Sequence, residues 1–466
     1  MTEVAPLVTS ETVSVKKIDF SRDALAFVKT QAHDAGLSEV RESGYAAFES
    51  LPFPTRKTEE WKYTSLHALT QQDYNQAAQN FDLEDASDLY VIDDLDAYRL
   101  VFVNGVFVEE LSDSISQAGI ELTTFSQANN KQRDLIAEYI GNIAETRRNL
   151  FTALNNAAVE EGVLLHVSKK IQLEKPLQIV HIVSQQEQAS TAFGRCLLVL
   201  ESLAEATVIE QFVSTNESQN LLLNQTTEIK IGDGAKLNHY RLHTEDETSL
   251  HFGGVYVDLN RDSQFESYQV ALGGKIKRFD VLVNHNQSGS HCEMKGVYLP
   301  KNDQHVDIHS YIEHISANCT TDETYRGIMA DRSKAVFNGR IHIHPDAQKS
   351  YANLSNKNLL LSNKAQINSK PELEIYADDV RCAHGVTVAQ LDDKACFYLQ
   401  SRGISRPEAE IMLSFAFINE LLESIPLEPL RKNLRPLLAQ QFSSNQDLTQ
   451  HILDEDSGVH SEEGAS

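Results

Sequence analysis

Residues 351–404 read YANLSNKNLLLSNKAQINSKPELEIYADDVRCAHGVTVAQLDDKACFYLQSRGI. A short motif, Lys-Ala with a large apolar residue two positions later, occurs twice in this stretch and once just before it, as SKAVF, NKAQI and DKACF. The alanines of the three copies are spaced 30 residues apart, at Ala335, Ala365 and Ala395. A fixed spacing of this size indicates one supersecondary unit per repeat, which can bury its apolar side chains only by stacking on its neighbours.

The sequence pattern around these repeats is typical of a β protein. Between residues 162 and 399 short apolar runs alternate with polar turns, as in LQIVHIV at 177–183 and ATVIEQFV at 206–213, and long helical periodicity is absent. We therefore predict a mainly β protein whose core, residues 161–400, is a solenoid. The small residue of each repeat is expected to mark a corner of the coil.

The N-terminal region, residues 1–160, is predicted to be mostly helical. Helical patterns cover residues 21–36, 39–49 and 131–149. Residues 100–107, LVFVNGVF, are strand-like, and their Asn-Gly pair predicts a hairpin.

The C-terminal helical region, residues 401–441, begins with a capping box. Ser405 and Glu408 have the required spacing, with a proline in the first turn. Apolar residues then recur on one helical face, at Ile411, Phe415, Ile418 and Leu422. We expect this helix, and a second apolar stripe from Leu430 to Leu438, to cap one end of the solenoid. Residues 442–466 are acidic and polar and are predicted to be a disordered tail.

Composition excludes several functional classes. The formal net charge of −26 argues against a nucleic-acid surface and an anionic membrane. No apolar run is long enough to span a bilayer, and the first residues, MTEVAPLVTSETVSVKK, contain no apolar signal segment. The five cysteines are dispersed, with no C-x-x-C pair, which fits a reducing cytoplasm and excludes a resident ferredoxin-type cluster. We therefore predict a cytoplasmic protein.

Cys382 and His384 are the candidate chemical residues. On a strand, residues i and i+2 point to the same face with Cα atoms about 6.5 Å apart, so a thiolate and an imidazole could meet one metal ion. The alternative is a buried cysteine beside a histidine that bonds a backbone carbonyl.

The other histidines lack a third ligand at a recognised offset. This holds for the pair His342 and His344 and for the group His305, His309 and His314, all of which we expect to be solvated. The sequence contains no phosphate-binding G-x-x-x-x-G-K-[ST] motif.

Two long segments resemble one known family. LLLSNKA, PELEIYADDVRCAHGVT and FYLQSRGIS resemble the C-terminal core of the SufB/SufD family, the scaffold subunits of the Suf iron–sulfur cluster assembly system. Residues 51–66, LPFPTRKTEEWKYTSL, resemble the opening signature of the SufD branch. The sister SufB branch carries a cysteine in the segment matching 355–361, and this chain has none there.

The resemblance implies a right-handed parallel β-helix flanked by α-helical regions. It further implies a non-catalytic scaffold that pairs with a SufB-like subunit and, through residues 405–440, with a SufC-like ABC-type ATPase, and that is served indirectly by a cysteine desulfurase. His384, with Cys382 beside it, would lie at the contact with the SufB-like subunit and share a transient iron–sulfur cluster.

The family also suggests reduced flavin in the assembled complex. The chain alone would hold no tightly bound cofactor and could homodimerise.

Two other functions remain open. A purely structural subunit would only hold the ATPase subunits in place. A β-helix polysaccharide-degrading enzyme could use Asp378 and Asp379, but the expected secretion signal is missing.

We expect the purified chain alone to hydrolyse no ATP and to hold no stable iron–sulfur cluster, because it lacks a phosphate-binding loop and its cysteines are scattered. Phosphate-release and acid-labile-sulfide assays check this. A brown, sulfide-containing preparation would contradict the prediction.

Overall fold

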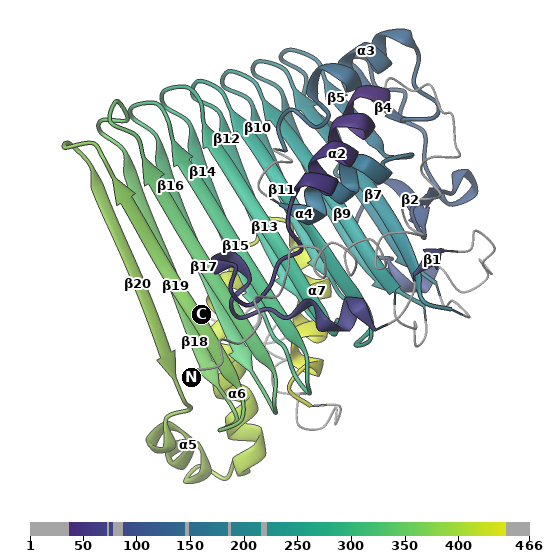
Figure 1. The fold of residues 1–466 in the computed structure, drawn as a ribbon. Helices are drawn as coiled ribbons and strands as arrows, with labels where there is room; N and C mark the ends of the chain where they lie inside the picture. The colour runs from purple at the N-terminus through teal and green to yellow at the C-terminus, as the bar shows by residue number, and fades with distance from the viewer. Residues whose placement is uncertain are drawn as a thin grey trace, which may run out of the picture.

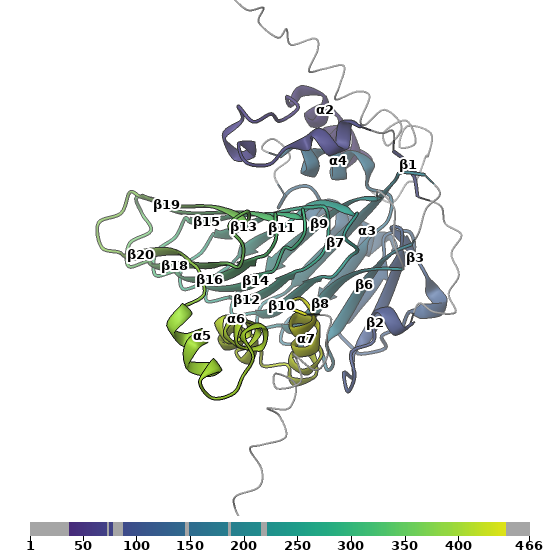
Figure 2. The same ribbon diagram turned by 90° about the horizontal axis from the view of Figure 1, so that it is seen from below.

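The computed structural model describes residues 37–71, 74–77, 87–144, 149–184, 188–215 and 221–443. Two ten-stranded sheets face each other, and from β5 to β20 successive strands alternate between them, so that each coil contributes one strand to each sheet (Figures 1 and 2). Neighbouring strands are parallel except in the pairs β2–β3 and β4–β5. The predicted mainly β, parallel solenoid is confirmed.

The first sheet contains β1 (Asn75–Gln76), which pairs with β7, and nine strands in the spatial order β19 (Gln366–Ile375), β17 (Lys334–Ile343), β15 (His305–His314), β13 (Ile276–His285), β11 (Leu250–Leu259), β9 (Leu221–Ile231), β7 (Ser190–Leu200), β5 (Val163–Val167) and β4 (Ile120–Thr124). The second sheet has the order β20 (Arg381–Ala389), β18 (Tyr351–Leu360), β16 (Thr320–Met329), β14 (His291–Tyr298), β12 (Gln264–Ala271), β10 (Lys236–His243), β8 (Glu205–Ser214), β6 (Leu177–Val183), β2 (Tyr98–Val103) and β3 (Val106–Phe107).

The helices are α2 (Ser38–Ser50), α3 (Asn130–Tyr139), α4 (Leu150–Ala158), α5 (Asp393–Gln400), α6 (Arg406–Glu423) and α7 (Glu428–Gln440). Short 3₁₀ turns are η1 (Glu59–Trp61), η2 (Leu66–Thr70), η3 (Ser87–Leu89) and η4 (Glu109–Leu111). No helix in the described parts of the chain combines the length and the apolar composition that crossing a membrane requires.

The coils turn from the first sheet to the second at stacked corners. At each of these corners one residue has a positive φ, as at Leu203, Gly234, Asp262, Gly289, Asn318 and Lys349. A small buried residue follows directly, as at Ala204, Ala235, Ser263, Ser290, Cys319 and Ser350. The small side chain leaves room for the tight turn. Ala335 of the repeat motif does not take this position: it lies within β17, with its side chain in the core.

The repeat motif is only partly in structural register. Lys334 pairs with Gln366, so Ala335 of SKAVF lies opposite Ile367 rather than opposite Ala365 of NKAQI. The third copy, DKACF, was wrongly predicted to be a coil corner. It forms α5, because Asp392 caps a helix there by accepting a hydrogen bond from the Lys394 N–H.

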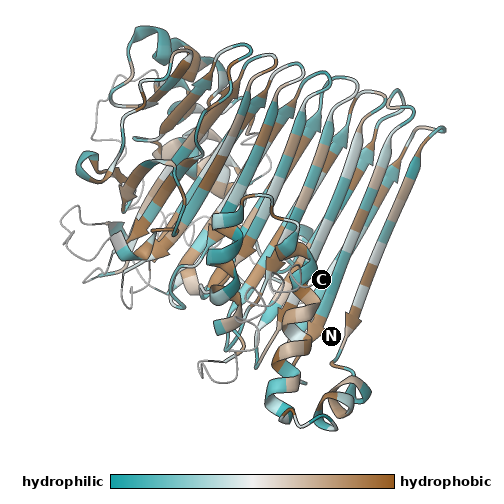
Figure 3. Cartoon of the chain, turned by 180° about the vertical axis from the view of Figure 1, so that it is seen from behind, coloured by the Kyte–Doolittle hydropathy of each residue, from teal (hydrophilic) through white to brown (hydrophobic). Residues whose placement is uncertain are grey.

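The interior between the sheets is built by alternation along each strand. In β17, Phe337, Ile341 and Ile343 point inward and are fully buried, whereas Arg340 and His342 point outward and are half-buried. Brown and teal segments alternate along the strands in Figure 3 for the same reason. The inward residues of the solenoid's coils join one continuous core cluster.

Charged groups are also buried. Arg195 pairs with Glu228 at 2.5 Å on the outer face of the first sheet, beneath α4. Inside the solenoid, Glu210 accepts a 2.7 Å hydrogen bond from His239. Glu245 contacts both His251 and Lys277. These contacts satisfy charges that would otherwise be very costly to bury.

The N-terminal helices cover the outer face of the first sheet (Figure 2). Helices α2 and α4 pack together over β7, β9 and β11. Trp61 belongs to this layer: its ring lies 5.5 Å from that of Phe151, and the Arg278 guanidinium lies 3.8 Å from its centre. Trp61 is thus a packing residue of this layer.

The C-terminal helices α6 and α7 cover the outer face of the second sheet instead of capping an end of the solenoid (Figure 2). The predicted capping box of Ser405 and Glu408 is present. The expectation of an end cap was wrong, because outward apolar residues of the second sheet, including Tyr268, Ile328 and Leu359, offer the helices a larger apolar surface. The last coil, β19 and β20, is left with a free edge.

Several N-terminal predictions need correction. The helix expected at 131–149 ends at Tyr139, and a separate helix, α4, begins at Leu150. The Asn104-Gly105 hairpin is confirmed between β2 and β3. The helix predicted at 21–36 and all but the first two residues of the predicted tail, 442–466, lie outside the described residues.

Glu323 yields a prediction about stability and pH. It is fully buried, the described residues pair no cation with it, and burial raises the pKa of its carboxyl from 4.5 to about 7. A carboxyl with a higher pKa in the folded chain stabilises the fold below pH 4.5 and loses that contribution as the pH rises to about 7. Glu323→Gln should therefore raise the free energy of unfolding more at pH 8 than at pH 5, by at most about 3 kcal/mol, and the melting temperature should rise more at pH 8.

Glu293→Gln, on the partly exposed side of the adjacent strand, is the matched control and should show little pH-dependent gain. Thermal unfolding followed by circular dichroism at both pH values measures the difference. An equal effect of Glu323→Gln at pH 5 and pH 8 would contradict the prediction.

Candidate functional site

The candidate pair, Cys382 and His384, lies on β20, the outermost strand of the second sheet (Figure 1). Among the described strands, β20 is hydrogen-bonded only to β18, where Cys382 lies opposite Ala352 and His384 opposite Leu354. Because Ala352 and Leu354 are buried in the core, their partners on β20 face the interior side of the coil. The structure thus brings the predicted pair to one face.

The two side chains differ in exposure because no further coil covers β20. Cys382 is half-buried against the core, whereas His384 is exposed. Burial raises the pKa of the Cys382 thiol, and a hydrogen bond with the Ala352 backbone offsets part of that rise. The free chain therefore holds a protonated thiol that a metal ion or a cationic neighbour would convert to thiolate.

The other cysteines are poor ligand candidates. Cys196, Cys292, Cys319 and Cys396 are all buried. Burial raises the pKa of the Cys196 and Cys292 thiols well above their ordinary value. Cys382 is therefore the most accessible thiol.

The free edge around the pair is apolar. Five large hydrophobic side chains are exposed on the last coil and its corners: Tyr351, Leu361, Ile375, Tyr376 and Val388. An unpaired strand edge with exposed apolar side chains is a template for pairing with another chain. The chemistry-bearing pair thus lies on the surface of this chain best suited to a protein contact.

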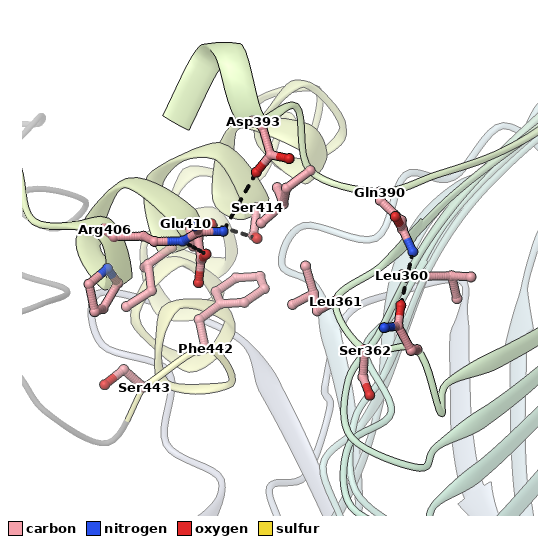
Figure 4. A pocket seen from close by; sticks show the side chains of 14 residues that line it. Leu360, Leu361, Ser362, Gln390, Asp393, Arg406, Glu410, Ser414, Phe442 and Ser443 are labelled. Carbon is pink, nitrogen blue, oxygen red and sulfur yellow. Dashed lines mark hydrogen bonds and ion pairs between the residues drawn. The ribbon is translucent and has the colours of Figure 1, made fainter. Parts of the chain in front are cut away.

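A pocket of about 470 Å³ separates this edge from the C-terminal helices (Figure 4). Leu360 and Leu361 line it from the solenoid side, and Arg406 and Glu410 line it from α6. Arg406 donates to Glu410 at 2.8 Å, so the charge at this end of the helix is already paired. The titratable side chains that line the pocket, Asp393, Arg406 and Glu410, form one group of ion pairs.

The four residues predicted to bind a partner are not on the surface. Ile411, Phe415, Ile418 and Leu422 are buried against the outer face of the second sheet. The exposed apolar residues of this region are Phe397 and Tyr398 of α5, which sequence reasoning missed because α5 was assigned to the solenoid. The prediction that these four residues contact a partner directly is therefore wrong. They hold α6 against the second sheet instead.

The histidines were largely misjudged from the sequence. His305 is only slightly exposed and bonds Thr64 at 2.7 Å, and His309 and His314 are buried, although all three were expected to be solvated. His314 bonds Thr321 at 3.0 Å across the corner between β15 and β16. His309 contacts Asp307 and Tyr311 of its own strand. Among these polar contacts, only that of His305 is with a residue distant in sequence, Thr64.

Comparisons with known proteins cover nearly the whole chain. The family model described as SUF system FeS cluster assembly, SufBD core domain, matches residues 181–417, and the SufBD protein N-terminal region matches residues 15–179. The chain is 33% identical to the iron–sulfur cluster assembly protein SufD of Escherichia coli over 84% of its own length and 89% of that protein.

More distant relatives include both branches of the family. The chain is 26% identical to SufD of Bacillus subtilis over 88% of its length and 94% of that protein, and 21% identical to SufB of the same organism over 69% of each. The matched regions include β20 with its cysteine and histidine. The chain belongs to the SufB/SufD family of iron–sulfur cluster assembly proteins.

Proposed function

We propose that this chain is a SufD-type, non-catalytic scaffold subunit that works in the cytoplasm. It pairs with a SufB-like subunit through the free edge of the solenoid and binds a SufC-like ABC-type ATPase through its C-terminal helices. The observation that carries the proposal is the position of Cys382 and His384 together on an uncovered edge strand.

The cluster is cargo that two chains hold together. Cys382 and His384 supply at most two ligands, whereas an iron–sulfur cluster normally takes four, so the remaining ligands come from the partner. Imidazole ligates iron in Rieske-type centres, and His384, being exposed, can reach across the contact.

The raised pKa of the Cys382 thiol supports a ligand that is engaged only when iron arrives. Metal binding to a thiol releases its proton, so the raised pKa weakens metal binding by Cys382 in the free subunit at neutral pH. His384 therefore makes the larger contribution, and Cys382 the smaller one.

The free edge supports a heterodimer in which strands continue from one subunit into the other. β19 and β20 each present unpaired backbone groups on their outer side, flanked by exposed Ile375 and Val388. In the absence of a SufB-like subunit, a second copy of this chain could occupy the same edge.

The second candidate is a purely structural role, which the same edge would also support, because docking alone needs no cluster chemistry. The polar, accessible His384 favours the chemical role, since a contact built only for docking would place an apolar residue at this inward position, as Leu354 does one coil earlier.

For the ATPase, α5 and the free side of α6 form the proposed docking surface. Phe397 is 71% exposed and Tyr398 is 52% exposed, and the pocket beside them offers a concave neighbour. Exposed aromatic residues next to a pocket are typical anchors of protein contacts.

His384→Ala should leave assembly with the partners intact but mature little cluster, and Cys382→Ser should do less harm, because His384 is the accessible ligand. Thr387→Ala, on the opposite face of the same strand, is the control. Co-purification and acid-labile sulfide in the assembled complex measure both properties. Normal cluster maturation by His384→Ala, in cells without another assembly system, would leave the structural role as the better description.

Phe397→Glu should weaken ATPase binding by at least about tenfold, because it places a charge where an apolar anchor is buried on docking. Leu203→Glu, a similarly exposed apolar residue on a distant corner, should bind normally. Surface plasmon resonance with the ATPase measures both. The Phe397→Glu substitution tests the docking surface more specifically than deletion of residues 405–466, because the deletion would expose the apolar outer face of the second sheet. Unchanged affinity of Phe397→Glu would place the docking surface elsewhere.

A further inference from the structure

Three side chains with metal-ligating atoms converge on the outer face of the first sheet. Glu313 of β15 pairs in register with His342 of β17, and His344 follows directly after β17 (strands in Figure 1). One oxygen of Glu313 lies 2.6 Å from His342 Nδ1 and 3.0 Å from His344 Nε2. All three ligand atoms lie within 4.8 Å of one another.

The local sequence explains this convergence. In Ile341-His342-Ile343-His344 the isoleucines are fully buried, so the pleat directs both histidines outward. The coil then places Glu313 beside them, because it occupies the equivalent position one coil earlier. Tyr376 lies against the His342 ring, edge to face at 5.4 Å, and limits its rotation.

Two other histidine–carboxylate clusters differ from this one in access and charge. The groups His181–Cys196–Glu210 and His243–Glu245–His251 are fully buried inside the solenoid. Glu245 is already paired with Lys277, and Glu210 is held by the nearby positive charge of Arg241 and by a hydrogen bond from His239. In both buried groups the carboxylate is already neutralised by a neighbouring cation.

The outer cluster, in contrast, is accessible and carries a net negative charge. The side chains of His342, His344 and Glu313 are 19%, 37% and 13% exposed. Arg340 is the nearest cation, 3.4 Å from Glu313, but it forms a two-pronged ion pair with Glu374 at 2.8 and 2.9 Å. With neutral imidazoles, the two carboxylates and one guanidinium leave one negative charge to attract a dication.

We propose that Glu313, His342 and His344 bind one divalent first-row transition-metal ion, independently of the Cys382–His384 site. Two imidazoles and one carboxylate are the ligand set of His₂Glu zinc sites and of facial non-haem iron sites, with the remaining positions open to water. The two ring nitrogens that contact Glu313 are the ligand atoms. When the metal binds, each imidazole stays neutral, and the proton it donated to the carboxylate is lost to solvent while its other ring nitrogen takes one up. In a tetrahedral site with bonds of about 2.0–2.1 Å the ligand atoms lie about 3.3 Å apart, so the Glu313 oxygen must move about 0.7 Å away from His342 Nδ1 and about 0.3 Å away from His344 Nε2.

Cobalt(II) titration of the full-length chain, without an affinity tag, tests the proposal. We expect one equivalent of Co²⁺ to bind with visible d–d bands and without a sulfur-to-metal charge-transfer band, because no thiolate takes part. Zn²⁺ should displace it, and Mg²⁺, which prefers oxygen ligands, should not.

His342→Ala, His344→Ala and Glu313→Gln should each weaken Co²⁺ binding at least about 100-fold, since loss of a ligand exceeds the loss caused by outer-shell substitutions. His344 lies beyond the end of β17 and is the most exposed ligand, so His344→Asn keeps the test valid if a strand variant fails to fold. His291→Ala on β14 and His384→Ala on β20 are the controls and should bind Co²⁺ normally.

Retention of the cobalt spectrum in both His342→Ala and His344→Asn, or no stoichiometric binding by the unmodified chain, would overturn the proposal. Loss of binding in His384→Ala alone, with a charge-transfer band in the unmodified chain, would also overturn it, because the metal would then lie at the cysteine site. Cluster maturation in the assembled complex is a separate readout, so failure here leaves the proposed scaffold role untouched.

Discussion

The hydrogen-bonded ladders between successive coils hold the whole molecule together. Each coil contributes one strand to each sheet, and each inward side chain rests on the residue at the same position one coil away, as Met294, Glu323, Leu354 and His384 do. A coil buries its inward side chains fully only where another coil stacks on it. The inward side chains of the last described coil are therefore partly exposed, and its strands have a free edge. The uncovered position of Cys382 and His384 is a direct consequence.

Buried charged groups are tolerated because stacking supplies their partners. Arg195 and Glu228 come from β7 and β9, which are adjacent strands of the first sheet, and form a fully buried pair between this sheet and α4. Burial of such pairs contributes little net stability but penalises any slip in register, since a slip would leave both charges unpaired. Glu323 has no such ion pair among the described residues, and burial raises the pKa of its carboxyl group instead.

Helices cover the outer faces of the two sheets to different extents. The N-terminal helices lie over β7 to β11, and α6 and α7 lie over the second sheet, where their apolar stripes are used entirely for packing. The first sheet therefore keeps accessible polar side chains on β15 and β17, including Glu313 and His342. Three surfaces result that differ in chemistry: the free edge, the exposed aromatics of α5, and the histidine–glutamate cluster, which adjoins the free edge through Tyr376.

The sequence by itself determined the solenoid, the capping box at Ser405 and the shared face of Cys382 and His384, because all three depend on spacings within one or two turns or one repeat. It misassigned DKACF, since a helix cap and a coil corner begin with similar residues. Tertiary structure alone decided that α6 buries Ile411 and Phe415 against the second sheet and that Glu313 joins His342 and His344. Those contacts depend on which strands are adjacent and on how many residues each coil contains. Local sequence gives neither.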